Sequence, residues 1–147
     1  MSKREIVRAL RDLDGPTLHT PVVMAVRGPQ AQALAAEVAD TVTFVQLPGE
    51  SRVEVARLAR DFRAIRDVEL ALHVPVIGDA VAPFMAPPDT DPAALRAVDS
   101  LAVLPDDPAA AAEEIRRRRE EIGFSYFVVG ANIADALAPV VAELAGH

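Results

Sequence analysis

The chain has 147 residues, of which 51% are hydrophobic and 25% charged, and its length is typical of one domain with a buried core, so residues 1–147 are taken as a single domain. Its formal net charge of −7 argues against nonspecific nucleic-acid binding, and the absence of cysteine, with only three scattered histidines, argues against a metal site. No apolar run is long enough for a membrane span, and the charged N-terminus is unlike a signal peptide, so the sequence predicts a cytoplasmic protein.

The first part of the chain alternates helical and strand patterns. Ser2 with Glu5, and Ser51 with Glu54, have the spacing of capping boxes, which begin helices. Short β-branched runs predict the strands, and a proline just after Gly28 suits the first turn of a helix. The predicted elements are a helix at 2–13, a strand at 21–26, a helix at 29–38, a strand at 40–47 and a helix at 51–66.

The stretch VELALHVPVI predicts a third strand with two distinct faces. Pro75 lacks an N–H, so pairing is expected to stop there. His73 either lines a barrel lumen or lies under a helix as a hydrogen-bonded structural residue. One face carries Val68, Leu70, Leu72, Val74 and Val76, and the other carries Glu69, Ala71, His73 and Pro75.

The second half contains a proline-rich loop and a charged helix. The loop, residues 78–90, is interpreted as a possible lid over a site. Asp107 with Pro108 behind it predicts the start of a helix, and Gly123 its end. In the run of arginines at 116–119, the first three have glutamates at i,i+4 spacing, which favours a solvated, salt-bridged face for the run. The other predicted elements are a helix at 92–98, an extended segment at 100–105, a strand at 124–130 and a final helix at 132–144.

Strands that alternate with helices predict a parallel α/β sheet built from right-handed βαβ units. Two architectures remain open at this point. One is an open sheet with helices on both faces. The other is half of an eight-stranded β/α (TIM-type) barrel, with about four parallel βα units.

Two segments resemble the second half of the luciferase-like flavin and deazaflavin oxidoreductases. They are IRRRREEIGFSYFVVGANIADALAPVVAELAG near the C-terminus and PVVMAVRGPQAQALAAEVADTVTF near the N-terminus. The resemblance implies a half-barrel whose four strands correspond to strands five to eight of the family's barrel. It also implies FMN or a deazaflavin as cofactor, oxidoreductase or monooxygenase chemistry, and completion by association, as a homodimer or with a complementary half-barrel chain. Four βα units alone cannot close a barrel.

Barrels of this kind place their sites in the loops at the carboxyl ends of the strands. The candidate cofactor-binding residues are Arg27, Gly28, Gln46, Gly78, Asp79, Gly130 and Asn132. Arg27 and Gly28 begin a helix whose N–H groups suit phosphate, although a plain turn with a solvated arginine is the alternative. Gly130 and Asn132 repeat this arrangement, with Asn132 as a helix cap in the alternative.

The remaining candidates have weaker chemical arguments. Asp79, after Gly78, either binds a hydroxyl of a small-molecule ligand or makes a turn. Gln46 is positioned to reach the edge of a cofactor ring. No Ser/His/Asp set is present, so hydrolase chemistry is not supported and no catalytic residue is named. Two further hypotheses stay open: a non-catalytic dimerising or regulatory module, and an open-sheet domain that binds a small anion.

Overall fold

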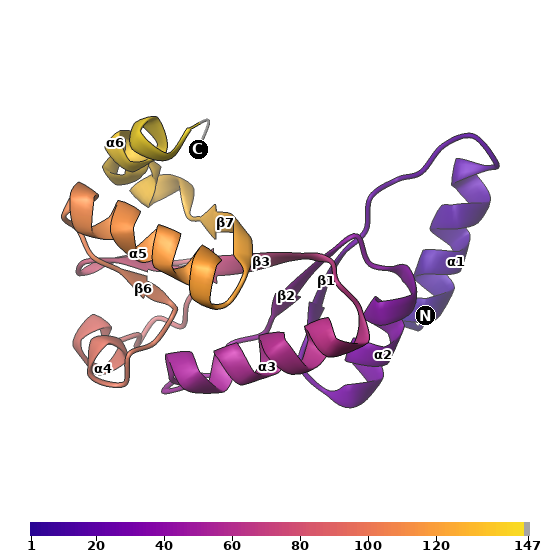
Figure 1. The fold of residues 1–147 in the computed structure, drawn as a ribbon, viewed down its shortest axis with the longest axis horizontal. Coiled ribbons are helices and arrows are strands. Elements are labelled where there is room, and N and C mark those ends of the chain that lie inside the picture. Colours follow the sequence, from indigo (N-terminus) through magenta and orange to yellow (C-terminus); the bar gives the residue numbers. More distant parts are fainter. Residues whose placement is uncertain (146–147) are drawn as a thin grey trace.

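The computed structural model describes residues 1–145 and shows a mixed α/β fold (Figure 1). The elements are α1 (Lys3–Asp14), β1 (Val23–Val26), α2 (Pro29–Val38), β2 (Thr41–Phe44), α3 (Arg52–Ile65), β3 (Glu69–Val74), β4 (Val76–Ile77), β5 (Ala80–Val81), α4 (Pro92–Ala97), β6 (Val103–Leu104), α5 (Pro108–Glu121), β7 (Phe124–Val129), the short 3₁₀ helix η1 (Ala131–Ile133) and α6 (Ala134–Leu144). Within residues 1–145, no helix is both long and apolar enough to cross a membrane.

The main sheet has four strands in the order β1-β2-β3-β7, and all three junctions are parallel. This order follows the chain, with helices in the connections, as expected for βαβ units. The parallel α/β sheet predicted from the sequence is confirmed. A register shift between Leu70 and Ala71 brings Tyr126 beside Ala71 in the β3–β7 junction.

The βα-unit helices α2, α3 and α5 cover one face of this sheet. Val26, Phe44 and Leu72 point into a buried cluster with residues of these helices. The aromatic rings of Phe44 and Phe62 meet edge to face, with centroids 6.2 Å apart. Residues on the opposite side of the strands, such as Val23 and Tyr126, are exposed. The βα-unit helices lie on one face and follow the order of the strands. This arrangement is compatible with half of a β/α barrel, and it does not match the alternative architecture, an open sheet with helices on both faces.

Pro75 divides the third predicted strand as expected. β3 ends at Val74 and pairs with β7, whereas β4 begins at Val76 and pairs with β6. The sequence did not predict β5, which runs antiparallel to β4 through a turn at Gly78 and Asp79. The φ of Gly78 is +58°, a value that glycine adopts without strain. The predicted loop at 78–90 therefore opens with a short hairpin.

The predicted helix starts are confirmed by their capping contacts. Ser2 and Ser51 each accept a hydrogen bond from the backbone of a glutamate three residues later, whose carboxylate accepts one from the serine N–H. Asp107 caps α5 through the N–H of Ala110. These local interactions fix where the connections between strands end and the helices begin.

Candidate functional site

A hollow near the carboxyl ends of the strands lies on the face that α2, α3 and α5 leave uncovered. It has a volume of about 630 Å³, within the range of small-molecule sites. Its floor includes Ala25, Thr43 and His73 on three neighbouring strands. Residues 85–98, including α4, form the opposite wall. The proline-rich segment therefore takes the position of a lid over the candidate site.

Gln46 contributes the most distinctive polar atom of this cavity. Its Nε2 donates to the carbonyl oxygen of His73 at 3.1 Å, which fixes the amide. Its Oε1 is buried and accepts no hydrogen bond. An orphaned buried acceptor is costly, so it indicates a place for a donor from a ligand or a water molecule. The sequence placed Gln46 at the end of the second strand, and the structure places it in the cavity wall.

His73 is joined to the neighbouring strand by a contact of 3.0 Å between its Nδ1 and Thr43 Oγ1. It does not lie under a helix: it is on the uncovered face of the sheet and lines the cavity. Burial lowers the pKa of the His73 imidazole from its ordinary value of 6.5. The neutral ring is thus favoured in the folded protein.

This shift predicts that acidification weakens the fold through His73. Because the pKa is lower in the folded than in the unfolded chain, the stability is fully present above about pH 6.5 and declines as the pH falls through that value. Replacing His73 with glutamine should flatten this part of the curve, measured by urea denaturation at a series of pH values. The matched variant His19→Gln should retain the decline, and an unchanged curve in His73→Gln would contradict the assignment.

Arg27 is not free to bind an anion without rearrangement. Its guanidinium makes two hydrogen bonds with the Glu50 carboxylate, at 3.1 and 3.0 Å, and a third with the carbonyl oxygen of Val45 at 2.9 Å. Glu50 also accepts from the N–H of Leu47, which lines the cavity. Arg27 and Glu50 therefore position the loop after β2. Gly28 is the N-cap of α2 and lies next to open space, without a side-chain cap.

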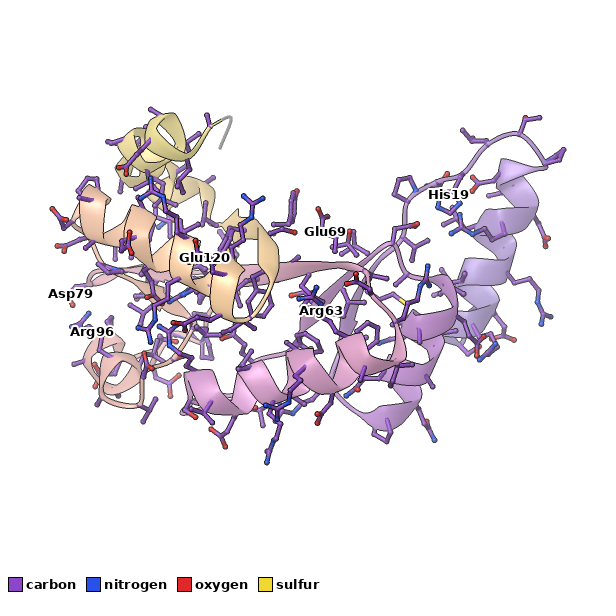
Figure 2. The ribbon with its side chains drawn as sticks, viewed as in Figure 1. His19, Arg63, Glu69, Asp79, Arg96 and Glu120 are labelled. Atoms are coloured by element: carbon purple, nitrogen blue, oxygen red, sulfur yellow. The ribbon has the colours of Figure 1, made fainter. Side chains whose placement is uncertain are left out.

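Gly78 and Asp79 lie at a different hollow, of about 470 Å³, between α4, β6 and α5. Figure 2 shows Asp79 beside Arg96, whose guanidinium reaches its carboxylate at 2.9 Å. Arg96 also donates to the carbonyl oxygen of Gly78. These two residues thus make a turn that is held by an ion pair, and they are not part of the cavity that Gln46 lines.

Gly130 and Asn132 connect the end of β7 to the segment after β5. A Cβ on Gly130 would lie 2.4 Å from the Cβ of Ala82, so only glycine permits this approach. Asn132 donates from Nδ2 to the carbonyl oxygen of Val81 at 3.2 Å. The predicted helix cap is wrong, because α6 begins at Ala134 without a side-chain cap. The candidate residues therefore occupy separate places along the carboxyl ends of the strands.

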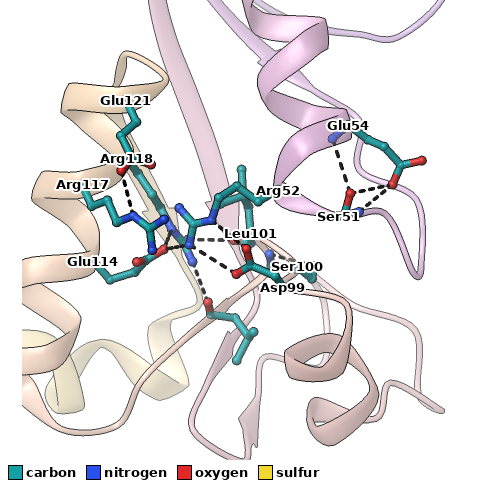
Figure 3. A network of polar contacts seen from close by, with 12 residues as sticks. Ser51, Arg52, Glu54, Asp99, Ser100, Leu101, Glu114, Arg117, Arg118 and Glu121 are labelled. Carbon is teal, nitrogen blue, oxygen red and sulfur yellow. Dashed lines mark hydrogen bonds and ion pairs between the residues drawn. The ribbon is translucent and has the colours of Figure 1, made fainter.

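The sequence analysis missed a buried charge network around Arg118 (Figure 3). Arg118 is only 1% exposed, and its guanidinium donates to the carbonyl oxygens of Leu101 and Val103. Its Nε donates to Glu114, which also pairs with Arg52. Burial would raise the pKa of the Glu114 carboxyl, but hydrogen bonds from the two arginines outweigh it and lower that pKa. The predicted solvated face is thus wrong for Arg118.

A comparison of the sequence with protein-family models finds no match, and a comparison with curated proteins finds none. The resemblance to luciferase-like oxidoreductases therefore remains a prediction.

Proposed function

We propose that this chain is a half-barrel that binds the ring of a flavin or deazaflavin in the cavity beside Gln46 and His73, with a second half supplied by association. The observation that carries the proposal is a cavity of about 630 Å³ whose wall includes Gln46, a residue with a buried and unpartnered Oε1. Its position at the carboxyl ends of parallel strands is the usual place for a ligand in this architecture.

The chemistry of the wall suits a flat, largely apolar ring system. Leu47, Met85 and Leu95 supply apolar surface. The pyrimidine edge of a flavin or deazaflavin carries an N–H donor, and the Gln46 oxygen is an acceptor without a partner. If the chain is an enzyme, the cofactor supplies hydride chemistry, while these residues bind and orient the ring.

The phosphate of FMN has a less complete site. Within residues 1–145, the cavity wall includes Asp89 and Asp91 and no lysine or arginine. The nearest candidates from the sequence are Arg27 and Gly28, and a phosphate there would have to compete with Glu50 for the guanidinium. The ring, and not the phosphate, is therefore expected to provide most of the affinity.

Titration with riboflavin and with 5-deazariboflavin tests the proposal, and the change of ligand fluorescence reports binding. The chain has no tryptophan, so protein emission does not obscure the signal. Replacing Gln46 with leucine should weaken binding about tenfold, because the ring donor loses its acceptor. The matched variant Gln32→Leu changes a glutamine on α2 that bonds to the carbonyl of Arg27, and it should bind as the wild type does.

The absence of saturable binding to both ring compounds would contradict the proposal. Equal affinities of the Gln46→Leu and wild-type proteins would contradict the assignment of the site. FMN that binds far more tightly than riboflavin would instead indicate a phosphate site, which Arg27→Ala should then weaken.

The non-catalytic dimerising or regulatory module is the second candidate. The contact that favours it is the pair between Arg27 and Glu50, which uses the cation that a phosphate would need. Such a module would bind neither ring compound and would still associate. The titration and a measurement of mass therefore separate the two candidates.

A further inference from the structure

The outer strands of the main sheet leave two parallel edges without a strand. Within residues 1–145, β1 pairs only with β2, and β7 pairs only with β3. The carbonyl oxygens of Val22 and Val26 accept bonds from the β2 side. Backbone groups alternate in direction along a strand, so those of Val23 and Ala25 face the free edge. An unpaired edge of this kind is a template for another strand.

The sheet face opposite α2, α3 and α5 carries no helix beyond the cavity, and its outer strands are the exposed part, whereas the small side chains of Thr41, Thr43 and Ala71 near its centre are buried. We call it the open face. Val23 is 61% exposed and Tyr126 is 53% exposed, although both belong to strands of a parallel sheet, which is normally covered on both faces. The residues of the open face are Val23, Ala25, Thr41, Thr43, Glu69, Ala71, His73, Tyr126 and Val128.

Helix α1 lies along the β1 edge and is only partly packed there. Its Lys3 reaches the carbonyl of Ala25, and its Arg11 reaches that of Thr20, so the helix runs antiparallel to β1. Leu10 of its apolar stripe packs against the core, but none of its residues is fully buried and Leu13 of the same stripe is 85% exposed. An amphipathic helix normally packs this stripe against another element.

The helices before β1 and after β7 differ in net charge. Helix α1 has four basic and three acidic side chains, which gives +1, whereas α6, which follows β7 through η1 and packs on α5, has two acidic side chains and no basic one, which gives −2. Arg4 and Glu143 already form ion pairs within the chain, with Glu37 and Arg116, so this difference in charge is modest. The side chain of Val141 on α6 is exposed. The β1 edge and the β7 edge thus complement each other in exposed apolar surface and backbone groups, and modestly in charge.

We infer that a second copy of this chain completes the barrel, with β7 of each copy beside β1 of the other. A two-fold axis parallel to the strands keeps all strands parallel and makes two identical junctions, so four strands become eight. At each junction, α1 of one copy lies against α6 of the other, and the two open faces form the lumen. This deepens the association part of the proposed function by naming the partner.

A contact within the chain, between Lys3 and Ala25, competes with strand pairing at the β1 edge. The Lys3 amine lies 3.4 Å from the Ala25 carbonyl oxygen, which a partner strand would need. A lysine at a strand edge disfavours pairing. This contact is long and exposed, so a backbone donor from β7 of the other copy can replace it.

Light scattering coupled to gel filtration tests the partner without any ligand. The wild-type protein should have twice the 15.6 kDa mass of one chain. Val23→Glu and Tyr126→Glu should each weaken dimerisation by about tenfold or more, because a charge would be buried in the lumen. Both side chains are exposed in the single chain, so its fold should persist. The control Val53→Glu changes a residue of α3 that is 75% exposed, and it should remain dimeric.

Crosslinking tests the arrangement, because a chain without cysteine accepts single thiols. A mixture of Val23→Cys and Tyr126→Cys proteins should crosslink through a short bismaleimide. Either variant alone should crosslink little, since β1 does not meet β1 in this dimer.

A monomeric wild-type protein, or a dimer indifferent to both charged variants, would overturn the inference. Preferential crosslinking of Val23→Cys to itself would also overturn it. A monomer that still binds riboflavin would contradict the dimer inference but support the proposed ligand site. A dimer that binds neither ring compound would support the dimer inference but contradict the proposed ligand site.

Discussion

Replacing Arg118 with methionine is expected to destabilise the fold by about 3–5 kcal/mol. The guanidinium lies 2.8 Å from the carbonyl oxygen of Leu101 and 2.7 Å from that of Val103, and its Nε lies 2.8 Å from Glu114. Methionine retains much of the apolar stem but leaves these acceptors without their donor. Each buried polar group without a partner costs about 1–3 kcal/mol. Urea denaturation, monitored by circular dichroism, measures the loss.

The neighbouring Arg117 provides a matched control for this prediction. It pairs with Glu121 on the same helix, and about half of its side chain is exposed. Exposed pairs of this kind contribute little, so Arg117→Met should change the stability by less than about 1 kcal/mol. Similar losses in the two variants, or a loss below about 1 kcal/mol in Arg118→Met, would show that the buried network does not hold α5 to the strand beside it.

The elements that the sequence predicted correctly depend on neighbours in the chain. A capping box requires only a serine and a glutamate three residues apart, as at Ser51 and Glu54. The alternation in β3 repeats every two residues, so it is visible in a single strand. Pro75 ends pairing through its own missing N–H. Local chemistry of this kind can be identified without knowledge of the rest of the fold.

The position of Arg118 shows where this reasoning is insufficient. Four consecutive helical residues span about 300° around the axis, so one of four arginines must face the sheet. Arg118 follows Ala111 and Ile115 at the spacing of the buried stripe, which was the signal that it lies inside. Glu114, four residues before Arg118, was an equally good signal for a solvent-exposed ion pair. The tertiary environment decided between the two.

Only part of the candidate site could be predicted, because tertiary contacts also decide the positions of its residues. Gln46 lies in the cavity, as its place after β2 indicated, but the partners of other candidates come from distant parts of the chain. Arg27 is held by Glu50, and Asp79 by Arg96. The strands β4, β5 and β6 have two residues each, too few to show a period. Long-range partners and very short strands leave little trace in a local pattern.

Replacing Phe62 with alanine is expected to cost about 3–5 kcal/mol of stability. Phe62 is fully buried in α3, and its ring meets that of Phe44, the last residue of β2, edge to face. The loss combines the transfer of a large aromatic side chain with the cavity that it leaves. Phe62→Leu preserves more of the volume and should cost less. Denaturant unfolding of both variants measures the two effects.

The same helix provides the control, because Ile65, three residues after Phe62, is mostly exposed. Ile65→Ala should therefore cost less than about 1 kcal/mol, and a loss equal to that of Phe62→Ala would contradict the layer arrangement. Phe44 lies two residues before Gln46, so the Phe62 ring also supports the strand end that holds the cavity acceptor. Phe62→Leu should accordingly weaken ring binding as well as stability, whereas Ile65→Ala should affect neither.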